Sequence, residues 1–376
     1  MSARETDLLT LTMIVKDEAQ NLAATLASVK PFIDRWIIAD TGSTDGTPEV
    51  VKRAMEGVPG EVVEIPFVNF AETRNAGLDA CGEHTEFILW LDAEDVLQGG
   101  EALRRFLARE RKHRGPDPDR EAYYLRVDAG FAWNSPRVLR SRARWRFTGV
   151  VHEILTHEDR IAPTMRAPDV LILHNRAEHS VERTRRRWER DRLLLEEELG
   201  RSPTDTRATF YLAQTHACLG QIEPAINVYQ RRVALGGWRE EIYESKFQVA
   251  LLSQQAGRPW PEVLALYLGA HAFAPHRAEP LYQVALHHNL RGEHALAVLY
   301  ARRGLDLPFP EQDQLFVLEE IYRWKLADLM GASAFWIGEF EMGEAAARKA
   351  CRARPDDARL QKNLAFYLER KKKPKR

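Results

Sequence analysis

The chain has 376 residues and is 44% hydrophobic, which is enough for two domains with apolar cores. Its 54 basic and 55 acidic side chains give a net charge of −1, so no overall field would draw it to nucleic acid or to a membrane. Its three cysteines lie far apart and match neither a disulfide framework nor a zinc spacing. No signal-peptide pattern and no apolar run of bilayer-spanning length is present, so the sequence predicts a cytoplasmic protein without stable membrane insertion.

The first part of the chain alternates apolar, β-branched runs with amphipathic helical patterns. Thr47 is expected to cap the second helix, with Pro48 in its first position. Such alternation predicts βαβ units and a parallel sheet. The predicted strands are 8–15, 36–39, 62–65 and 87–91, and the predicted helices include 19–29 and 71–81.

Charged residues follow three of these strands directly, namely Lys16, Asp40 and Asp92. In parallel sheets, ligands bind beyond the carboxyl ends of the strands, so these side chains are expected to converge on one crevice. Asp92 is followed closely by Glu94 and Asp95, and crowded carboxylates need a neutralising partner. A divalent cation that also holds a diphosphate would serve, because hard cations bind carboxylate and phosphate oxygens together. A solvated acidic turn is the alternative interpretation.

Several common nucleotide and metal motifs are absent. Neither G-x-G-x-x-G nor G-x-x-x-x-G-K-[ST] occurs, so the sequence shows no dinucleotide fingerprint and no P-loop. His152 and His157 lie five residues apart in a β-rich segment, whereas a zinc protease needs histidines four apart on a helix.

Four motifs between Met13 and Glu94 instead resemble the inverting GT-A-fold glycosyltransferases of family 2. They are MIVKDE at 13–18, DTGSTDGT at 40–47, NFAETRN at 69–75 and LDAE at 91–94.

The resemblance implies a nucleotide-sugar donor, expected to be a UDP-sugar, and a bound Mn²⁺ or Mg²⁺. It implies that Asp40 reaches the nucleoside, that Arg74 and Asn75 lie by the diphosphate, and that Asp92 and Glu94 carry the metal. A cation and Arg74 would then meet the negative charge that grows on the leaving diphosphate. The donor-binding residues expected from these motifs are Val15, Lys16, Glu18, Asp40, Ser43, Arg74, Asn75, Leu91 and Asp92.

The metal motif departs from the family pattern. The family usually has Asp-x-Asp, whereas this chain has Asp92-Ala93-Glu94-Asp95. Glutamate reaches one methylene further and can still ligate, directly or through a bridging water. Asp95 is the other candidate, although its side chain should leave in another direction if the strand pleat continues.

A second block, from Trp145 to Glu153, resembles a motif of bacterial lipopolysaccharide-core glucosyltransferases and of repeat-containing transferases of the same family. An inverting transfer needs a base that takes the acceptor proton, and carboxylates and histidines are the usual acid-base groups. Glu153 is the leading candidate and His152 the second. The alternative is a hydrogen-bonded structural pair. The acceptor is expected to enter over Trp133 and this segment.

His174 follows a predicted strand at 170–173, where the resemblance implies a further metal ligand; a structural histidine is the alternative. From Ser180 the strands stop, and arginines alternate with glutamates along one predicted helix. We interpret residues 181–203 as a solvated, salt-bridged linker helix.

The remaining residues show internal similarity. Gly220, Gly257 and Gly292 are spaced close to the tetratricopeptide period of about 34 residues, and a longer step to Gly338 predicts an insertion around 308–314. Such repeats build a groove that binds peptides or partner proteins. A dimerisation or rigidifying module without a ligand is an equal alternative. A capping helix is expected at 356–371, followed by a basic, solvated tail.

The predicted architecture is thus an α/β GT-A domain with a mostly parallel sheet at 1–180, the linker helix at 181–203, and an all-α tetratricopeptide-like domain at 204–376. Both halves together resemble tetratricopeptide-containing family 2 transferases, including bacterial enzymes that glycosylate cysteine or serine in peptide antibiotics. The predicted function is metal-dependent, inverting transfer of a sugar to a peptide, protein or glycan. A catalytically decayed domain in a protein-binding scaffold is the alternative. A sugar nucleotidyltransferase is disfavoured, because its glycine-rich first loop is missing.

Overall fold

The computed structural model describes residues 6–82, 84–113, 117, 120–129, 132–157, 165–174, 181–313 and 315–372. Residues 373–376 of the predicted basic tail lie outside this set. The chain divides into two compact units, Met1–Arg201 and Ser202–Arg376. No described helix combines the length and the apolar character that crossing a bilayer would require.

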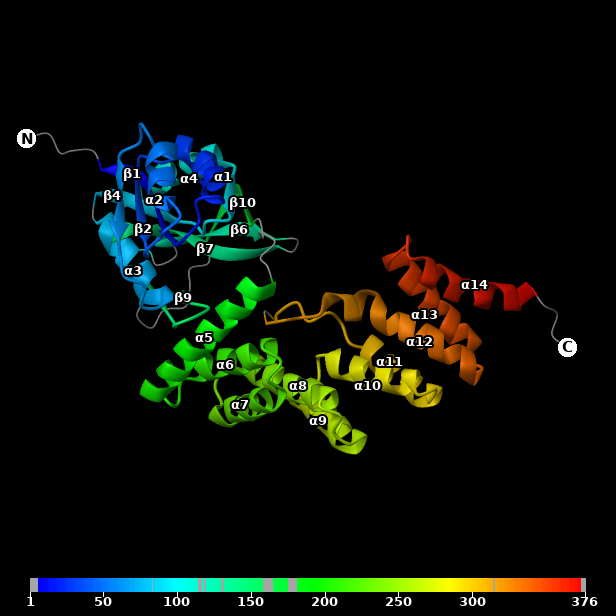
Figure 1. Cartoon of the computed structure of the whole chain (residues 1–376). Coiled ribbons are helices and arrows are strands. Elements are labelled where there is room, and N and C mark those ends of the chain that lie inside the picture. The colour runs from blue at the N-terminus through cyan, green and yellow to red at the C-terminus, as the bar shows by residue number, and fades with distance from the viewer. Residues whose placement is uncertain are drawn as a thin grey trace, which may run out of the picture. The chain divides into compact units, whose positions relative to one another are not determined.

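The first unit is built on one mixed sheet (Figure 1). Along the sheet the described strands lie in the order β3-β2-β1-β4-β7-β6-β10-β5. The pairs β1–β2, β2–β3, β1–β4 and β6–β10 are parallel, and the other three pairs are antiparallel. This confirms the predicted mostly parallel α/β architecture. The strands are β1 Asp7–Val15, β2 Arg35–Asp40, β3 Gly60–Glu64, β4 Thr85–Trp90, β5 Asp95–Gln98, β6 Ala122–Asp128, β7 Ala132–Arg140 and β10 Arg166–His174.

Helices cover both faces of this sheet (Figure 1). On one face, Leu22 of α1 (Leu22–Val29), Val51 of α2 (Thr47–Ala54) and Leu103 of α4 (Gly100–Glu110) belong to the same buried cluster. On the other face, Leu78 of α3 (Phe70–Cys81) packs with Phe147 of β8. The short strands β8 (Arg146–Thr148) and β9 (Ile154–Thr156) form a separate antiparallel pair. Each of these helices places its apolar residues, which recur at helical spacing, on the side that packs against the sheet.

The register of the central strands brings their ends together. Val15 at the end of β1 lies opposite Asp40 at the end of β2, and Thr12 lies opposite Trp90 of β4. Because these strands are parallel, the residues that follow them lie at one edge of the sheet.

The predicted cap of α2 is shifted by one residue. Gly46, with φ of +87°, is the N-cap, and Thr47 is the first residue of the helix. The Thr47 hydroxyl donates to Asp45 Oδ1 at 2.6 Å and accepts from the Glu18 amide at 2.9 Å. The prediction that Thr47 is the cap was wrong because its hydroxyl joins the loop after β1 instead of the helix amides.

The helix α5 (Val181–Arg201) belongs to the first compact unit. Its Asp191 and Leu195 are buried, whereas most of its other described side chains are exposed or half-buried.

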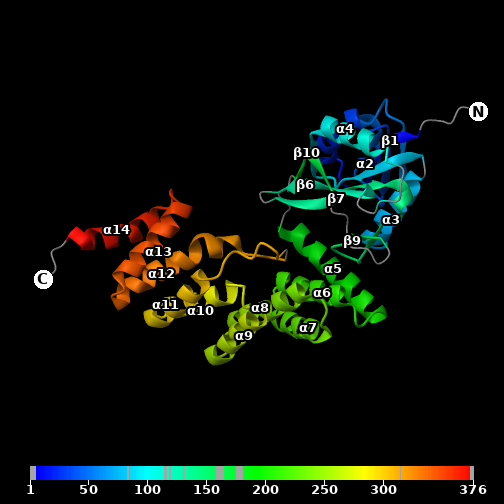
Figure 2. The same ribbon diagram turned by 180° about the vertical axis from the view of Figure 1, so that it is seen from behind.

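The second unit is an array of antiparallel helix pairs (Figure 2). Gly220, Gly257, Gly292 and Gly338 each join the two helices of a pair and have φ between +72° and +81°. Glycine adopts this left-handed conformation without steric penalty, which explains the period seen in the sequence. The helices are α6 Thr206–Cys218, α7 Ile222–Leu235, α8 Arg239–Gln255, α9 Trp260–Phe273, α10 Glu279–Leu290, α11 His294–Leu305, α12 Leu326–Ala334, α13 Phe340–Ala353 and, at the end, α14 Ala358–Lys372.

The predicted insertion lies between α11 and α12. It is held by Arg277, a fully buried side chain that donates to Asp313 Oδ2 at 3.1 Å and pairs with Glu279 at 2.8 Å. Glu279 also accepts from the Tyr322 hydroxyl at 2.8 Å. Because every charge in this network has a partner, it ties the insertion to the repeat array.

We predict that Gly99→Ala destabilises the first unit more than Gly57→Ala does. Both glycines have a left-handed φ, +77° and +87°, so both variants incur a penalty of about 1–2 kcal/mol. A Cβ at Gly99 would also lie 2.1 Å from the Asp169 carbonyl oxygen, whereas a Cβ at Gly57 would meet nothing within 4 Å. The clash should add about 1–3 kcal/mol, measured by urea unfolding. Equal losses in the two variants would contradict this packing.

Candidate functional site

The acidic run after β4 forms a tight turn whose side chains diverge. Asp95 is fully buried and its Oδ2 accepts from the Asp92 amide at 2.9 Å. Asp92 is about one-third exposed at its side chain, and it lines a cavity together with Glu94. Glu94 and Asp95 therefore have separate positions, one on the cavity and one beneath it.

Arg74, from α3, joins two of the predicted site carboxylates. Its Nη2 lies 2.6 Å from Asp92 Oδ1, and its Nε lies 2.6 Å from Glu153 Oε1. Its guanidinium also lies 4.6 Å from the Trp90 ring centroid and 5.6 Å from that of Phe147. Burial alone would lower the pKa of Arg74, but the two carboxylates outweigh it and raise that pKa, so the side chain stays charged.

Arg137, from β7, holds the acidic turn from the other side. Its Nη1 lies 3.3 Å from Asp92 Oδ2 and 3.0 Å from Asp95 Oδ2. The guanidinium is stacked 3.8 Å from the Trp90 ring centroid. Burial would raise the pKa of Asp92, but Arg74 and Arg137 together hold it well below its usual range. Sequence reasoning missed Arg137, because nothing in a β-strand pattern shows which cation reaches a turn more than forty residues away.

His174, at the end of β10, lies beside the acidic turn. Its Nδ1 is 2.8 Å from Asp95 Oδ1, and its Nε2 is 3.7 Å from Glu94 Oε2. The hydrogen bond with Asp95 raises the pKa of His174. This contact also orients the ring so that Nε2 faces Glu94.

The side chains of Asp92, Glu94 and His174 are of the types that bind a divalent cation. Carboxylates are suitable ligands for Mn²⁺ and Mg²⁺, and an imidazole can add a nitrogen ligand. Within the described residues, however, no three such groups are gathered closely enough to hold a metal ion. Glu94 and His174 lie together, whereas both oxygens of Asp92 are engaged by Arg74 and Arg137.

The loop after β2 is shaped by Asp40. This buried carboxylate accepts from the amides of Gly42 and Ser43 at 3.1 and 3.0 Å, and from the Ser43 hydroxyl at 2.5 Å. The Ser43 Oγ in turn accepts from the Asp17 amide at 2.9 Å. Asp40 and Ser43 therefore set the conformation of the loop that adjoins the cavity.

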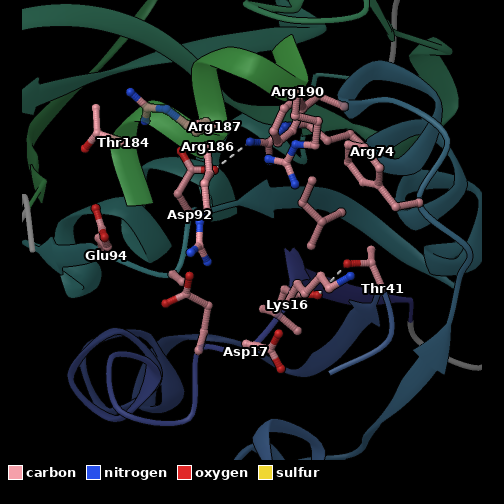
Figure 3. A pocket seen from close by; sticks show the side chains of 16 residues that line it. Lys16, Asp17, Thr41, Arg74, Asp92, Glu94, Thr184, Arg186, Arg187 and Arg190 are labelled. Atoms are coloured by element: carbon pink, nitrogen blue, oxygen red, sulfur yellow. Dashed lines mark hydrogen bonds and ion pairs between the residues drawn. The ribbon is translucent and has the colours of Figure 1, made fainter. Parts of the chain in front are cut away.

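A cavity of about 1030 Å³ lies at this edge of the sheet (Figure 3). Thr41, next to Asp40, lines it, and so do Phe67 and Phe70. The predicted residues in its lining are Val15, Lys16, Glu18, Arg74, Asp92 and Glu94.

The other predicted residues surround this cavity or support it. Leu91 is fully buried in the core. Asn75 donates to the Phe147 carbonyl at 2.9 Å and accepts from the Phe147 amide at 2.8 Å, which fixes β8 against α3. Glu153 pairs with Arg74, and the preceding His152 is exposed with φ of +50°.

Three arginines from α5, Arg186, Arg187 and Arg190, also line the cavity, together with Thr184 (Figure 3). Sequence reasoning assigned this helix to solvent. The only signal for another role was the arginine spacing, which places Arg186 and Arg190 on one side of the helix at i and i+4.

Part of the first unit is similar to a known protein family. Residues 10–123 match the model of the family described as Glycosyl transferase family 2. This confirms the resemblance carried by the four motifs, and it supports glycosyltransferase activity for the domain. The match runs from β1 to the start of β6, and it therefore includes Arg74, Asp92 and Glu94.

A curated relative is the TPR repeat-containing protein Synpcc7942_0270 of Synechococcus elongatus, 30% identical over 151 residues. The match covers 39% of this chain and 34% of the relative, so the chain spans about a third of the length of that protein.

Solved structures are similar to parts of the chain at low identity. A crystal structure of MamA is 15% identical over 47% of this chain and 88% of its own, with a TM-score of 0.36. TTC0263, a thermophilic TPR protein of Thermus thermophilus, is 21% identical over 49% of this chain and 91% of its own, with a TM-score of 0.30.

We predict that Arg137→Met lowers the free energy of unfolding by about 3–5 kcal/mol, because it leaves the buried Asp95 without its cation. Arg105 offers a matched control: it pairs with Glu101 on the exposed face of α4, and Arg105→Met should change stability by no more than about 0.5 kcal/mol. Chemical denaturation measures both. Similar effects of the two substitutions would show that Arg137 does not neutralise the acidic turn.

Proposed function

We propose that the protein is an inverting glycosyltransferase that moves a sugar from a nucleotide-sugar to a peptide, protein or glycan. UDP is the nucleotide we expect. The observation that carries the proposal is the cavity at the edge of a family 2 domain, where Arg74, Asp92 and Glu94 meet Lys16. Charged groups of both signs around one cavity suit a donor with an anionic diphosphate. The nucleoside diphosphate gains negative charge as it leaves the sugar, and nearby cations stabilise that charge.

In the reaction, an acceptor atom attacks the anomeric carbon while the bond from that carbon to the diphosphate oxygen breaks. The acceptor proton moves to a base, and the nucleoside diphosphate leaves with the bonding electron pair. Glu153 is the base we propose, because its carboxylate is held by Arg74, which itself lines the cavity. In an inverting displacement the acceptor and its base would stand on the face of the anomeric carbon opposite the leaving diphosphate. His152, which is exposed, is the second candidate.

Mn²⁺ or Mg²⁺ is part of this proposal, with Asp92, Glu94 and His174 as the residues that would hold it. When bound, such a cation supplies positive charge to the leaving diphosphate. Arg74 meets Asp92 directly, so it can also hold that carboxylate in position when no cation is near.

A protein-binding scaffold with a decayed catalytic domain is the second candidate. The observation that favours it is the engagement of both Asp92 oxygens by arginines. In either case, the helix pairs of the second unit would present a surface for an acceptor protein, for another partner or for a second copy of the chain.

The proposed activity predicts hydrolysis or transfer when the protein meets a panel of nucleotide sugars with Mn²⁺. Asp92→Ala should abolish turnover, because the diphosphate loses the carboxylate that positions its counter-charges. Circular dichroism should show that the variant remains folded. Released nucleotide, measured by chromatography, is the readout. Full activity in Asp92→Ala would refute the assignment, and absence of UDP binding to the unmodified protein, with or without Mn²⁺, would favour the scaffold.

Glu153→Gln should lower kcat by about 10²–10⁴, the range for loss of a general base, and leave the KM for the donor nearly unchanged. Glutamine keeps the shape and a carbonyl acceptor for Arg74 but cannot take the proton at neutral pH. The matched control is Glu101→Gln, on the exposed face of α4. Unchanged kcat in Glu153→Gln, with a drop in His152→Gln instead, would transfer the role of base to His152.

A further inference from the structure

The charges of the cavity lining are unbalanced until α5 is included. The strand ends and α3 contribute two cations, Lys16 and Arg74, against four carboxylates. Arg74 already pairs with Asp92 and with Glu153. An anionic diphosphate would be repelled by such a lining, because like charges in a shared site destabilise each other. The carboxylates in question are Asp17, Glu18, Asp92 and Glu94.

The helix α5 supplies the missing positive charge. Its three lining arginines reach the cavity from the side opposite Lys16 and Asp17 (Figure 3). Arg186 is engaged by Glu182 at 2.5 Å. Across the part of the chain that the structure describes, no carboxylate forms an ion pair with Arg187 or with Arg190.

Among the described residues, Arg190 is held by two aromatic rings and not by a carboxylate. Its guanidinium lies 5.4 Å from the Phe67 ring centroid and 5.8 Å from that of Phe70. The two rings pack edge to face, with centroids 5.3 Å apart. Both rings line the cavity, so they orient the guanidinium toward it and leave its N–H groups available to an anion.

Asp191, the next residue along α5, does not neutralise these arginines by a direct contact. It is buried, and its Oδ1 has no hydrogen-bond partner among the described residues. Burial raises the pKa of Asp191, although Arg190 and Arg187 act against this. Among the described residues, Asp191 therefore forms no ion pair with Arg187 or Arg190.

We propose that Arg187 and Arg190 bind the diphosphate of the nucleotide donor. The inference rests on the proposed function, and it makes α5 part of the donor site instead of a solvated linker. Guanidinium groups suit this ligand because their planar N–H pairs bind phosphate oxygens in a bidentate manner. The expected ligand is a nucleoside diphosphate, and these residues should not affect the binding of the nucleoside alone.

Titration of UDP into the full-length protein, with Mn²⁺ and separately with EDTA, tests the proposal. The Arg187→Ala/Arg190→Ala double variant should bind UDP about tenfold or more weakly, because each charged hydrogen bond contributes strongly. Arg185→Ala is the matched control, since Arg185 lies on the same helix, pairs with Glu189 and is absent from the cavity lining. Its UDP affinity should equal that of the unmodified protein. Uridine, followed by ligand-observed NMR, should bind both variants equally well.

Two results would overturn the proposal. Unchanged UDP affinity in the double variant would assign the arginines to another ligand, and an equal loss for UDP and uridine would show that they only support the fold. Failure of the proposed function gives a different result, because the unmodified protein would then bind none of UDP, GDP, CDP or dTDP. The affinity of the unmodified protein for UDP should also fall more steeply with salt than that of the double variant.

Discussion

Neutralisation of the acidic turn after β4 is the constraint on which the site depends. Asp92 and the fully buried Asp95 stand three residues apart, and Arg137 contacts both of them. Arg74 takes the second oxygen of Asp92. Carboxylates this close would otherwise repel one another or take up protons. The two guanidiniums stack on Trp90, the last residue of β4, so the strand that presents the carboxylates also supports the groups that neutralise them.

This arrangement links the architecture of the sheet to its chemistry. Arg74 comes from α3, Arg137 from β7 and His174 from β10, and the turn after β4 lies among them. The parallel core strands explain why a helix such as α3 reaches this edge, and the antiparallel β7 brings a cation back to it. The charges of this site constrain one another, because moving one of them would leave another without its partner.

The sequence predicted the order of the helices and strands and several of the residues that line the cavity. It did not predict which charged side chains pair with one another. The order of strands and helices followed from apolar periodicity, and the glycine spacing located the hairpins of the second unit. The crowding of Asp92, Glu94 and Asp95 correctly demanded positive charge. The sequence argument supplied it as a metal ion, which stays a prediction, and it did not foresee that Arg137, from a strand far along the chain, also contacts the turn. An ion pair between residues so far apart in the chain depends on the register in which the strands pair. Local sequence patterns do not reveal that register.

The role of α5 shows why charge counted over a whole chain says little about a site. The net charge of −1 predicts no field around the molecule, yet five cations and four carboxylates surround one cavity. A helix whose arginines and glutamates stand four residues apart looks in sequence like a solvent-exposed helix held by surface ion pairs. The exposed pair Arg186–Glu182 is such a surface ion pair. The packing of Arg190 against Phe67 and Phe70 separates the two cases. That aromatic contact holds a cation that forms no ion pair with any carboxylate in the described part of the chain. A cation held in this way lowers the free energy of a bound anion, because it needs little reorganisation when the anion arrives.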